Sequence, residues 1–186
     1  MNQLILHPRN MHAAINEASI LDTLRDLGLI DQSFDYQGKT HYQPGDAFLE
    51  RMIFLGCSPV IALGEPGLTG EDFCHVSLIP SAAEPRFWHG KNIKAPRCPH
   101  CRKPQTDWQT LITQWQTRQH DYRHRCAECD KETTIDELKW RQSAGFLRSG
   151  IIVWGIYEGE AVPSEGLMDA LQACSGEKWT YFYLQS

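Results

Sequence analysis

The chain has 186 residues, of which 41% are hydrophobic, and its formal net charge is −5. This length allows one or two domains with a buried core, and the composition is that of an ordinary globular protein. The N-terminal residues lack a basic stretch followed by a long apolar one, and the longest apolar run, IIVWGIY at 151–157, is too short to span a bilayer. The sequence therefore predicts a cytoplasmic protein with no membrane partner.

The first part of the chain is predicted to form two helices. Apolar residues follow helical spacing over residues 11–27, and Asn10 is placed to cap the start of that helix. Residues 31–45 are predicted to be a loop because of their composition. A second helix is expected over residues 46–56, where apolar residues again recur with helical spacing.

The remaining body elements are mostly strands. Residues 58–63 and 73–79 have strand character, and the glycines and proline between them predict a hairpin turn. A nearly continuous buried strand is expected over residues 150–160. A helix capped by Ser164 and a final aromatic strand at 178–184 complete a β-α-β unit.

Together these elements predict an α+β fold. An antiparallel sheet of about four strands would carry helices on one face, and a ferredoxin-like layout is one arrangement that fits this order. We expect residues 1–90 and 142–186 to form this discontinuous body. Residues 91–141 are then an insert between the second and third predicted strands.

Four of the seven cysteines form two tight pairs inside the insert. Cys98 and Cys101 stand in CPHC, and after 24 residues Cys126 and Cys129 stand in CAEC. Each C-x2-C turn can direct two thiolates at one metal ion, and two such turns complete the tetrahedron that zinc accepts. Four thiolates leave no open coordination position, so the expected Zn²⁺ is structural and does not activate water.

Other interpretations of the cysteines remain open at this point. The two pairs could be thioredoxin-like redox motifs, although such a motif normally opens a helix after a strand and one pair suffices. His100, His120 or His124 could replace a cysteine in a mixed site, but none has the two-residue knuckle spacing. The three unpaired thiols, Cys57, Cys74 and Cys174, are predicted to be packed structural residues.

With CPHC and CAEC as its two knuckles, the segment from about 94 to 140 resembles a zinc ribbon. The resemblance implies a bound metal and a ribbon fold, but no single activity, since zinc ribbons serve many roles. One feature departs from the pattern. Trp108, Leu111, Ile112 and Trp115 follow helical spacing where a ribbon would have strand, so residues 107–116 could be either.

Charge is unevenly distributed along the chain. Residues 86–141 hold twelve Lys/Arg and seven Asp/Glu, a net charge of +5, so the remainder carries −10. A basic insert in an acidic body can bind a polyanion or can dock on its own acidic neighbour. The predicted contact residues for a partner are Arg102, Lys103, Arg123 and Arg125.

The sequence thus predicts a non-enzymatic binding module. In this interpretation, a structural zinc ribbon presents a basic surface to a protein or nucleic-acid partner, and the overall acidity disfavours tight nonspecific DNA binding. The alternative is an enzyme whose active site lies in the body, away from a purely structural zinc. Against the enzyme, the sequence shows no nucleophile with a nearby base, no usefully spaced carboxylate pair and no cofactor loop.

Overall fold

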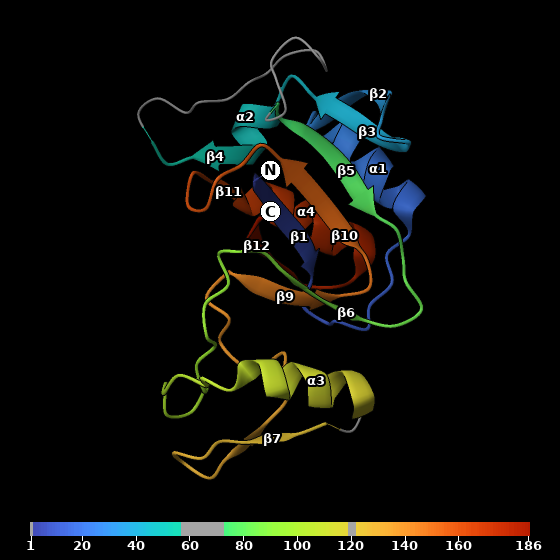
Figure 1. Cartoon of the computed structure of the whole chain (residues 1–186). Helices are drawn as coiled ribbons and strands as arrows, with labels where there is room; N and C mark the ends of the chain where they lie inside the picture. The colour runs from blue at the N-terminus through green and yellow to red at the C-terminus, as the bar shows by residue number, and fades with distance from the viewer. Residues whose placement is uncertain (1, 57–72, 119–121) are drawn as a thin grey trace.

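The computed structural model describes residues 2–56, 73–118 and 122–186 (Figure 1). At its centre is a six-stranded antiparallel sheet with the strand order β12-β1-β10-β5-β3-β2. The predicted α+β class is confirmed, but the sheet has six strands instead of about four, and a ferredoxin-like layout is not confirmed. Its strands are β1 (Asn2–Pro8), β2 (Ile30–Tyr36), β3 (Lys39–Pro44), β5 (His75–Ile79), β10 (Gly150–Trp154) and β12 (Trp179–Gln185).

The sequence patterns miss the first three of these strands. β1 lies between β12 and β10 and is buried on both faces, so it lacks the alternation that marks a half-exposed strand. Residues 31–45, predicted as a loop, form most of the hairpin of β2 and β3 instead. Gln37 and Gly38 make its two-residue turn with φ angles of 52° and 73°, as a type I′ turn requires.

Three helices pack on one face of this sheet: α1 (Glu17–Asp26), α2 (Phe48–Arg51) and α4 (Glu165–Ser175). Side chains that alternate along the strands meet the apolar faces of the helices there. This arrangement buries the largest core of the molecule. Its members include Leu4, Leu6, Ile20, Leu24, Phe48, Val76, Ile151, Val153, Leu167, Leu171 and Tyr183.

Both predictions for the N-terminal helices need correction. The first helix begins at Glu17, not at residue 11, because Asn16 caps it by accepting a hydrogen bond from the Ser19 N–H at 3.2 Å. The helix predicted over 46–56 is wrong beyond the four residues of α2. There the chain turns into β4 (Met52–Phe54), which pairs with β11 (Ala161–Pro163). Ile53 and Leu55, which supported the helical spacing, are 46% and 62% exposed.

The C-terminal predictions agree better with the structure. The Ser164 hydroxyl accepts from the Leu167 N–H at the start of α4, and Gly176 ends the helix with a φ of 73°. β10 and β12 both pair antiparallel with β1, so they run parallel to each other as the β-α-β unit requires. The strand expected over 150–160 is shorter, because β10 ends at Trp154. The strand expected at 58–63, and with it the predicted hairpin, lies outside the described residues.

A two-stranded sheet of β6 (Arg86–His89) and β9 (Ala144–Leu147) covers part of the other face of the large sheet. Trp88 and Leu147 point toward the large sheet, whereas Phe87 and Phe146 point away from it. Gly145 allows the close approach, since a Cβ at this position would lie 2.5 Å from the Phe182 ring. This small sheet connects two cores.

Between β6 and β9 the chain forms α3 (Trp108–Arg118), β7 (His124–Arg125) and β8 (Glu132–Thr133). These elements lie beyond the small sheet, away from the six-stranded one (Figure 1). The open question about residues 107–116 is thus settled as a helix. α3 buries Leu111, Ile112 and Trp115 against Phe87 and Phe146, so a second core forms between this segment and the outer face of β6 and β9.

Candidate metal centre

The four predicted ligands converge in the structure. All four Sγ atoms of Cys98, Cys101, Cys126 and Cys129 lie within 4.8 Å of one another. The Cys98 and Cys129 sulfurs are 3.8 Å apart, and those of Cys101 and Cys126 are 3.7 Å apart. With metal–sulfur bonds of about 2.3 Å, the edges of a tetrahedron measure about 3.8 Å. The spacing therefore fits one ion bound by four thiolates.

The two cysteine pairs sit in turns of the same construction. In the first, the Cys98 N–H donates to the Lys103 carbonyl and the Arg102 N–H donates to the Cys98 carbonyl. In the second, the Cys126 N–H donates to the Lys131 carbonyl and the Asp130 N–H donates to the Cys126 carbonyl. The printed sequence shows the same pattern, CPHCRK and CAECDK. Two equivalent turns thus present their sulfurs to a common point.

Each turn closes through a residue in the left-handed region. Arg102 has a φ of 63° and Asp130 a φ of 58°, at the same position of the two turns. This backbone shape costs a non-glycine residue roughly 1 kcal/mol. Both turns therefore have the same left-handed backbone shape at the residue that follows the second cysteine.

Backbone N–H groups aimed at the sulfurs favour thiolates. Burial opposes ionisation of Cys98, but the N–H groups of Cys101 and His100 bring the pKa of Cys98 down to about 7. At Cys129 the Lys131 N–H favours the thiolate, yet burial and the neighbouring sulfurs raise its pKa to about 12. Backbone N–H groups thus favour the thiolates, while the neighbouring sulfurs oppose the ionisation of Cys129. A bound cation would remove that repulsion.

A buried hydrogen-bond relay joins the two turns behind the sulfurs. The Gln105 Nε2 donates to the Lys103 carbonyl at 3.1 Å and lies 3.7 Å from the Cys126 Sγ. Its Oε1 lies 2.8 Å from the Nε2 of His124, which donates because an amide oxygen can only accept. Gln105 and His124 are only 6% and 8% exposed. The relay orients one amide against a ligand, as outer groups of metal sites do.

The sequence alone does not indicate this hydrogen-bond relay. Gln105 stands four residues after Cys101, outside any ligand spacing, and His124 was considered only as a replacement ligand. The contact depends on the bridge between Arg97 and Pro104 and on the pairing of β7 with β8, both of which are formed by the fold.

Searches against family models, curated proteins and solved structures found no match. The functional proposal therefore rests on the geometry and chemistry of the residues in this structure. No helix in the described part of the chain is long and apolar enough to cross a bilayer.

No described histidine joins the cysteine cluster. His124 is engaged by Gln105, His100 is exposed, and His120 lies outside the described residues. The convergence of the four sulfurs favours a shared ion over two separate redox pairs.

The unpaired thiols fit structural roles where they can be seen. Burial first, and then the charge of Glu160, raises the pKa of Cys74 to about 12. This thiol stays protonated and is a poor nucleophile. Cys174 is half-buried on α4, packed against the large core, and Cys57 lies outside the described residues.

The four predicted contact residues all lie on the surface around the cysteines. Arg102 and Lys103 belong to the first turn, and Arg123 and Arg125 precede the second. Arg125 is engaged locally, because its guanidinium pairs with Asp130 at 3.2 Å and with Glu132 at 3.1 Å. Its charge is therefore partly neutralised by its own neighbours, whereas no ion pair of Arg102, Lys103 or Arg123 is found among the described residues.

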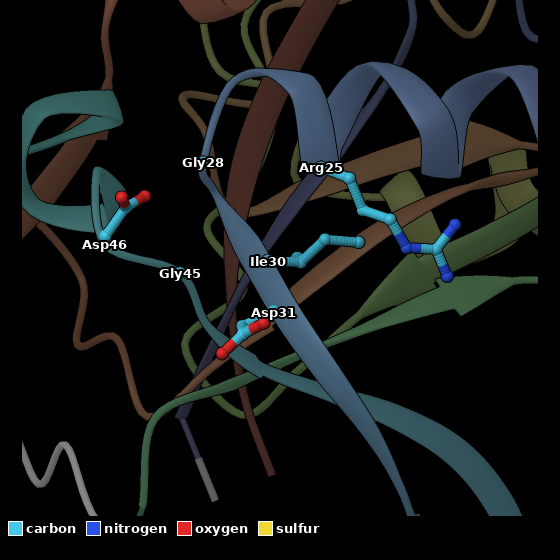
Figure 2. A pocket seen from close by; sticks show the side chains of 6 residues that line it. All are labelled: Arg25, Gly28, Ile30, Asp31, Gly45 and Asp46. Carbon is cyan, nitrogen blue, oxygen red and sulfur yellow. The ribbon is translucent and has the colours of Figure 1, made fainter.

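Elsewhere a hollow forms where the end of α1 meets the end of β3 (Figure 2). Gly45 is needed there, since a Cβ would lie 2.3 Å from the Gly28 carbonyl oxygen. The carboxylates of Asp31 and Asp46 point in different directions, and the Arg25 side chain extends away from both (Figure 2). Arg25 instead lies over the Tyr42 ring, 5.7 Å from its centre. This hollow brings no polar groups together and is a packing feature.

Proposed function

We propose that this chain is a zinc protein in which Cys98, Cys101, Cys126 and Cys129 bind one structural Zn²⁺. The observation that carries the proposal is the convergence of four sulfurs from two equivalent turns. A tetrahedral four-thiolate set suits zinc and leaves no position for water or substrate. The zinc then stabilises a ribbon-like insert at 91–141 between the body segments 1–90 and 142–186.

Metal content tests this proposal. The purified chain should carry one zinc per molecule by elemental analysis, and the double variant Cys101→Ser with Cys129→Ser should carry none. Cys174→Ser is the matched control, because it removes a thiol far along the chain from the cluster, and it should keep the zinc. Zinc retained by the double variant, or a wild-type chain that folds fully without any metal, would contradict the proposal.

We further infer that the insert is a binding module rather than a catalyst. Arg102, Lys103 and Arg123 are exposed; Arg102 and Lys103 belong to the first turn, which the metal would hold rigid, and Arg123 precedes β7, which leads into the second. A rigid cationic surface suits a protein partner with an acidic patch or the phosphates of a nucleic acid. Arg125 contributes less positive charge to this surface, because its guanidinium forms ion pairs with Asp130 and Glu132.

Salt dependence separates the two partner classes. With a 20-nucleotide RNA or a duplex DNA of the same length as probe, affinity should fall steeply with salt, and Arg102→Gln with Arg123→Gln should reduce the slope by about two. Gln keeps each stem while removing the charge. No binding at low salt would rule out nucleic acid and leave a protein partner, to be identified by cross-linking through the same surface.

A second candidate, an enzyme in the body, is favoured by one observation. The rings of His41 and His75 lie 4.8 Å apart, and the His41 Nδ1 and the His75 Nε2 are buried with no hydrogen-bond partner among the described residues. Burial lowers the pKa of His75 to about 4, so its imidazole is neutral near pH 7 and its unpartnered Nε2 offers a hydrogen-bond acceptor to a bound substrate. Turnover of ester, phosphoester or glycoside test substrates that is lost in His75→Phe would support this candidate.

A further inference from the structure

β3 and β5 are neighbours in the large sheet, yet they are joined at a single residue pair, Tyr42 with Val76. In a continuous antiparallel ladder, residues 39–41 of β3 would face residues 77–79 of β5. Instead the two strands diverge in that direction (Figure 1). The sheet therefore has a gap at this end, between strands that are each well paired on their other side.

The backbone groups that face the gap are unpaired. No ladder pair and no other backbone hydrogen bond joins residues 39–41 to residues 77–79 in the described structure. Two open strand edges thus face each other. An open edge offers alternating N–H and C=O groups at the spacing of a strand, which is a template for pairing with another chain.

A cavity of about 710 Å³ occupies the same place. Leu21 of α1 lines it from the helical side of the sheet, and Ile152 and Trp154 line it from the opposite side. Figure 1 accordingly shows α1 behind the gap. The Trp154 indole N–H donates to the Ser77 hydroxyl at 2.8 Å. This hydrogen bond fixes the orientation of the indole ring, whose apolar surface lines the cavity. The cavity therefore offers apolar surface on both faces of the sheet.

The charged groups at the cavity favour an acidic ligand. Lys39 and Arg86 line it, are exposed, and form no ion pair among the described residues. Glu17, also at the cavity, is already engaged because its carboxylate accepts from the Ser81 N–H at 3.1 Å. Two cations are thus available to a ligand, while Glu17, the acidic residue among those that line the cavity, already accepts a hydrogen bond.

We propose that this gap binds an extended peptide segment of another protein, which enters as a short strand between β3 and β5. Its backbone pairs with residues 39–41 on one side and residues 77–79 on the other. Side chains that alternate along the segment contact Leu21 on one face and Trp154 on the other. Acidic residues at its ends meet Lys39 and Arg86.

A peptide fits this gap better than a compact small molecule does. Only an extended backbone supplies donors and acceptors to two facing strand edges at once. The segment is short, because Pro80 has no N–H and follows β5 directly, so the ladder ends there. This site lies on the body and does not depend on the metal or on the basic residues of the insert.

The test uses the full-length protein and a displayed library of random heptapeptides. Selected sequences should alternate apolar residues and carry Asp or Glu near their ends. A synthetic copy of the best peptide should lose at least about tenfold in affinity when its two central amides are N-methylated, since this removes strand donors. Equal affinity of the methylated peptide would overturn the strand-insertion proposal.

Variants of the protein locate the binding. Leu21→Trp fills the cavity from α1 and should abolish binding, and Lys39→Glu with Arg86→Glu should weaken it at least about tenfold. Arg102→Glu with Lys103→Glu makes the same charge change on the insert and should leave peptide affinity unchanged. Circular dichroism checks that each variant folds. The proposal fails if the library yields no sequence that prefers the parent protein over Leu21→Trp, or if the insert variant loses binding equally.

Discussion

At the scale of single residues, the clearest division lies between groups that local spacing reveals and groups that only the fold brings together. The four cysteines are predictable because two residues per turn suffice to direct a pair of sulfurs at one ion. Gln105 is not predictable, because its contact with Cys126 crosses from one turn to the other. Its role is therefore the one that most needs a direct measurement.

We predict that Gln105→Leu weakens metal binding by about 10- to 100-fold while the chain stays folded. The substitution keeps the volume but removes the amide contact to the Cys126 sulfur and the hydrogen-bond partner of the His124 ring, while the Lys103 carbonyl keeps the Cys98 N–H as its donor. Competition with a chelator of known affinity measures the effect. Gln109→Leu, on the exposed side of α3, is the control and should bind metal as the parent does.

A second residue-scale prediction concerns His75. Burial depresses its folded pKa to about 4 from 6.5, so the native state holds it neutral. The unfolded chain takes up a proton more readily as pH falls below 6.5, and native stability is lost over the window from 6.5 toward 4. Between pH 7.5 and 5 this group accounts for about 2 kcal/mol of lost stability.

Urea unfolding at the two pH values checks this prediction. The variant His75→Phe keeps a ring among the aromatic neighbours Phe73 and Trp154 and removes the titrating group. Its stability should fall by about 2 kcal/mol less than that of the parent over the same interval. An identical acid dependence in both proteins would show that His75 is not kept neutral by the fold.

At the scale of elements, the capping signals of α4 predicted its ends, whereas the Asn10 cap was wrong for α1, which Asn16 caps, and apolar periodicity was wrong for residues 52–56. α4 lies where Ser164 and Gly176 indicate, because both residues act on their own turn of the backbone. The helix expected over 46–56 fails because Ile53 and Leu55 have helical spacing without being buried. β1 is not predicted because it is buried on both faces. Its sequence therefore lacks the alternation of apolar and polar residues that marks a half-exposed strand.

The small sheet of β6 and β9 yields a prediction at this scale. Gly145 brings β9 onto the Phe182 ring, where a Cβ would lie only 2.5 Å away. Gly145→Ala should therefore destabilise the chain by about 1–3 kcal/mol, since either β9 or the ring must move. Thermal unfolding measures the loss. Gly56→Ala is the control, because a Cβ there meets nothing within 4 Å, and a similar loss in both variants would contradict the packing argument.

At the scale of the whole molecule, the chain holds separate cores joined by the small sheet. The largest core lies between the six-stranded sheet and its helices, and a second lies between α3 and the outer face of β6 and β9. The charge split in the sequence follows the same division, with the basic segment beyond the small sheet. The sequence predicts a cysteine-bearing insert at 91–141. It could not predict that Phe87 and Phe146 give that segment a core shared with the body.

This arrangement predicts a local response to metal removal. A four-thiolate zinc site contributes about 10 kcal/mol to the folding of the segment around it, whereas the core of the six-stranded sheet contains none of the four clustered cysteines. In a strong chelator, amide hydrogen exchange should become fast in α3, β7 and β8 and stay slow in β1, β10 and β12. Re-addition of zinc should restore protection in α3, and Cys101→Ser with Cys129→Ser should reproduce the chelated pattern without chelator. Loss of protection in β1 together with α3 would show that the metal stabilises the molecule as one unit. Unchanged protection in α3 would show that the core α3 shares with β6 and β9 keeps it folded without the metal.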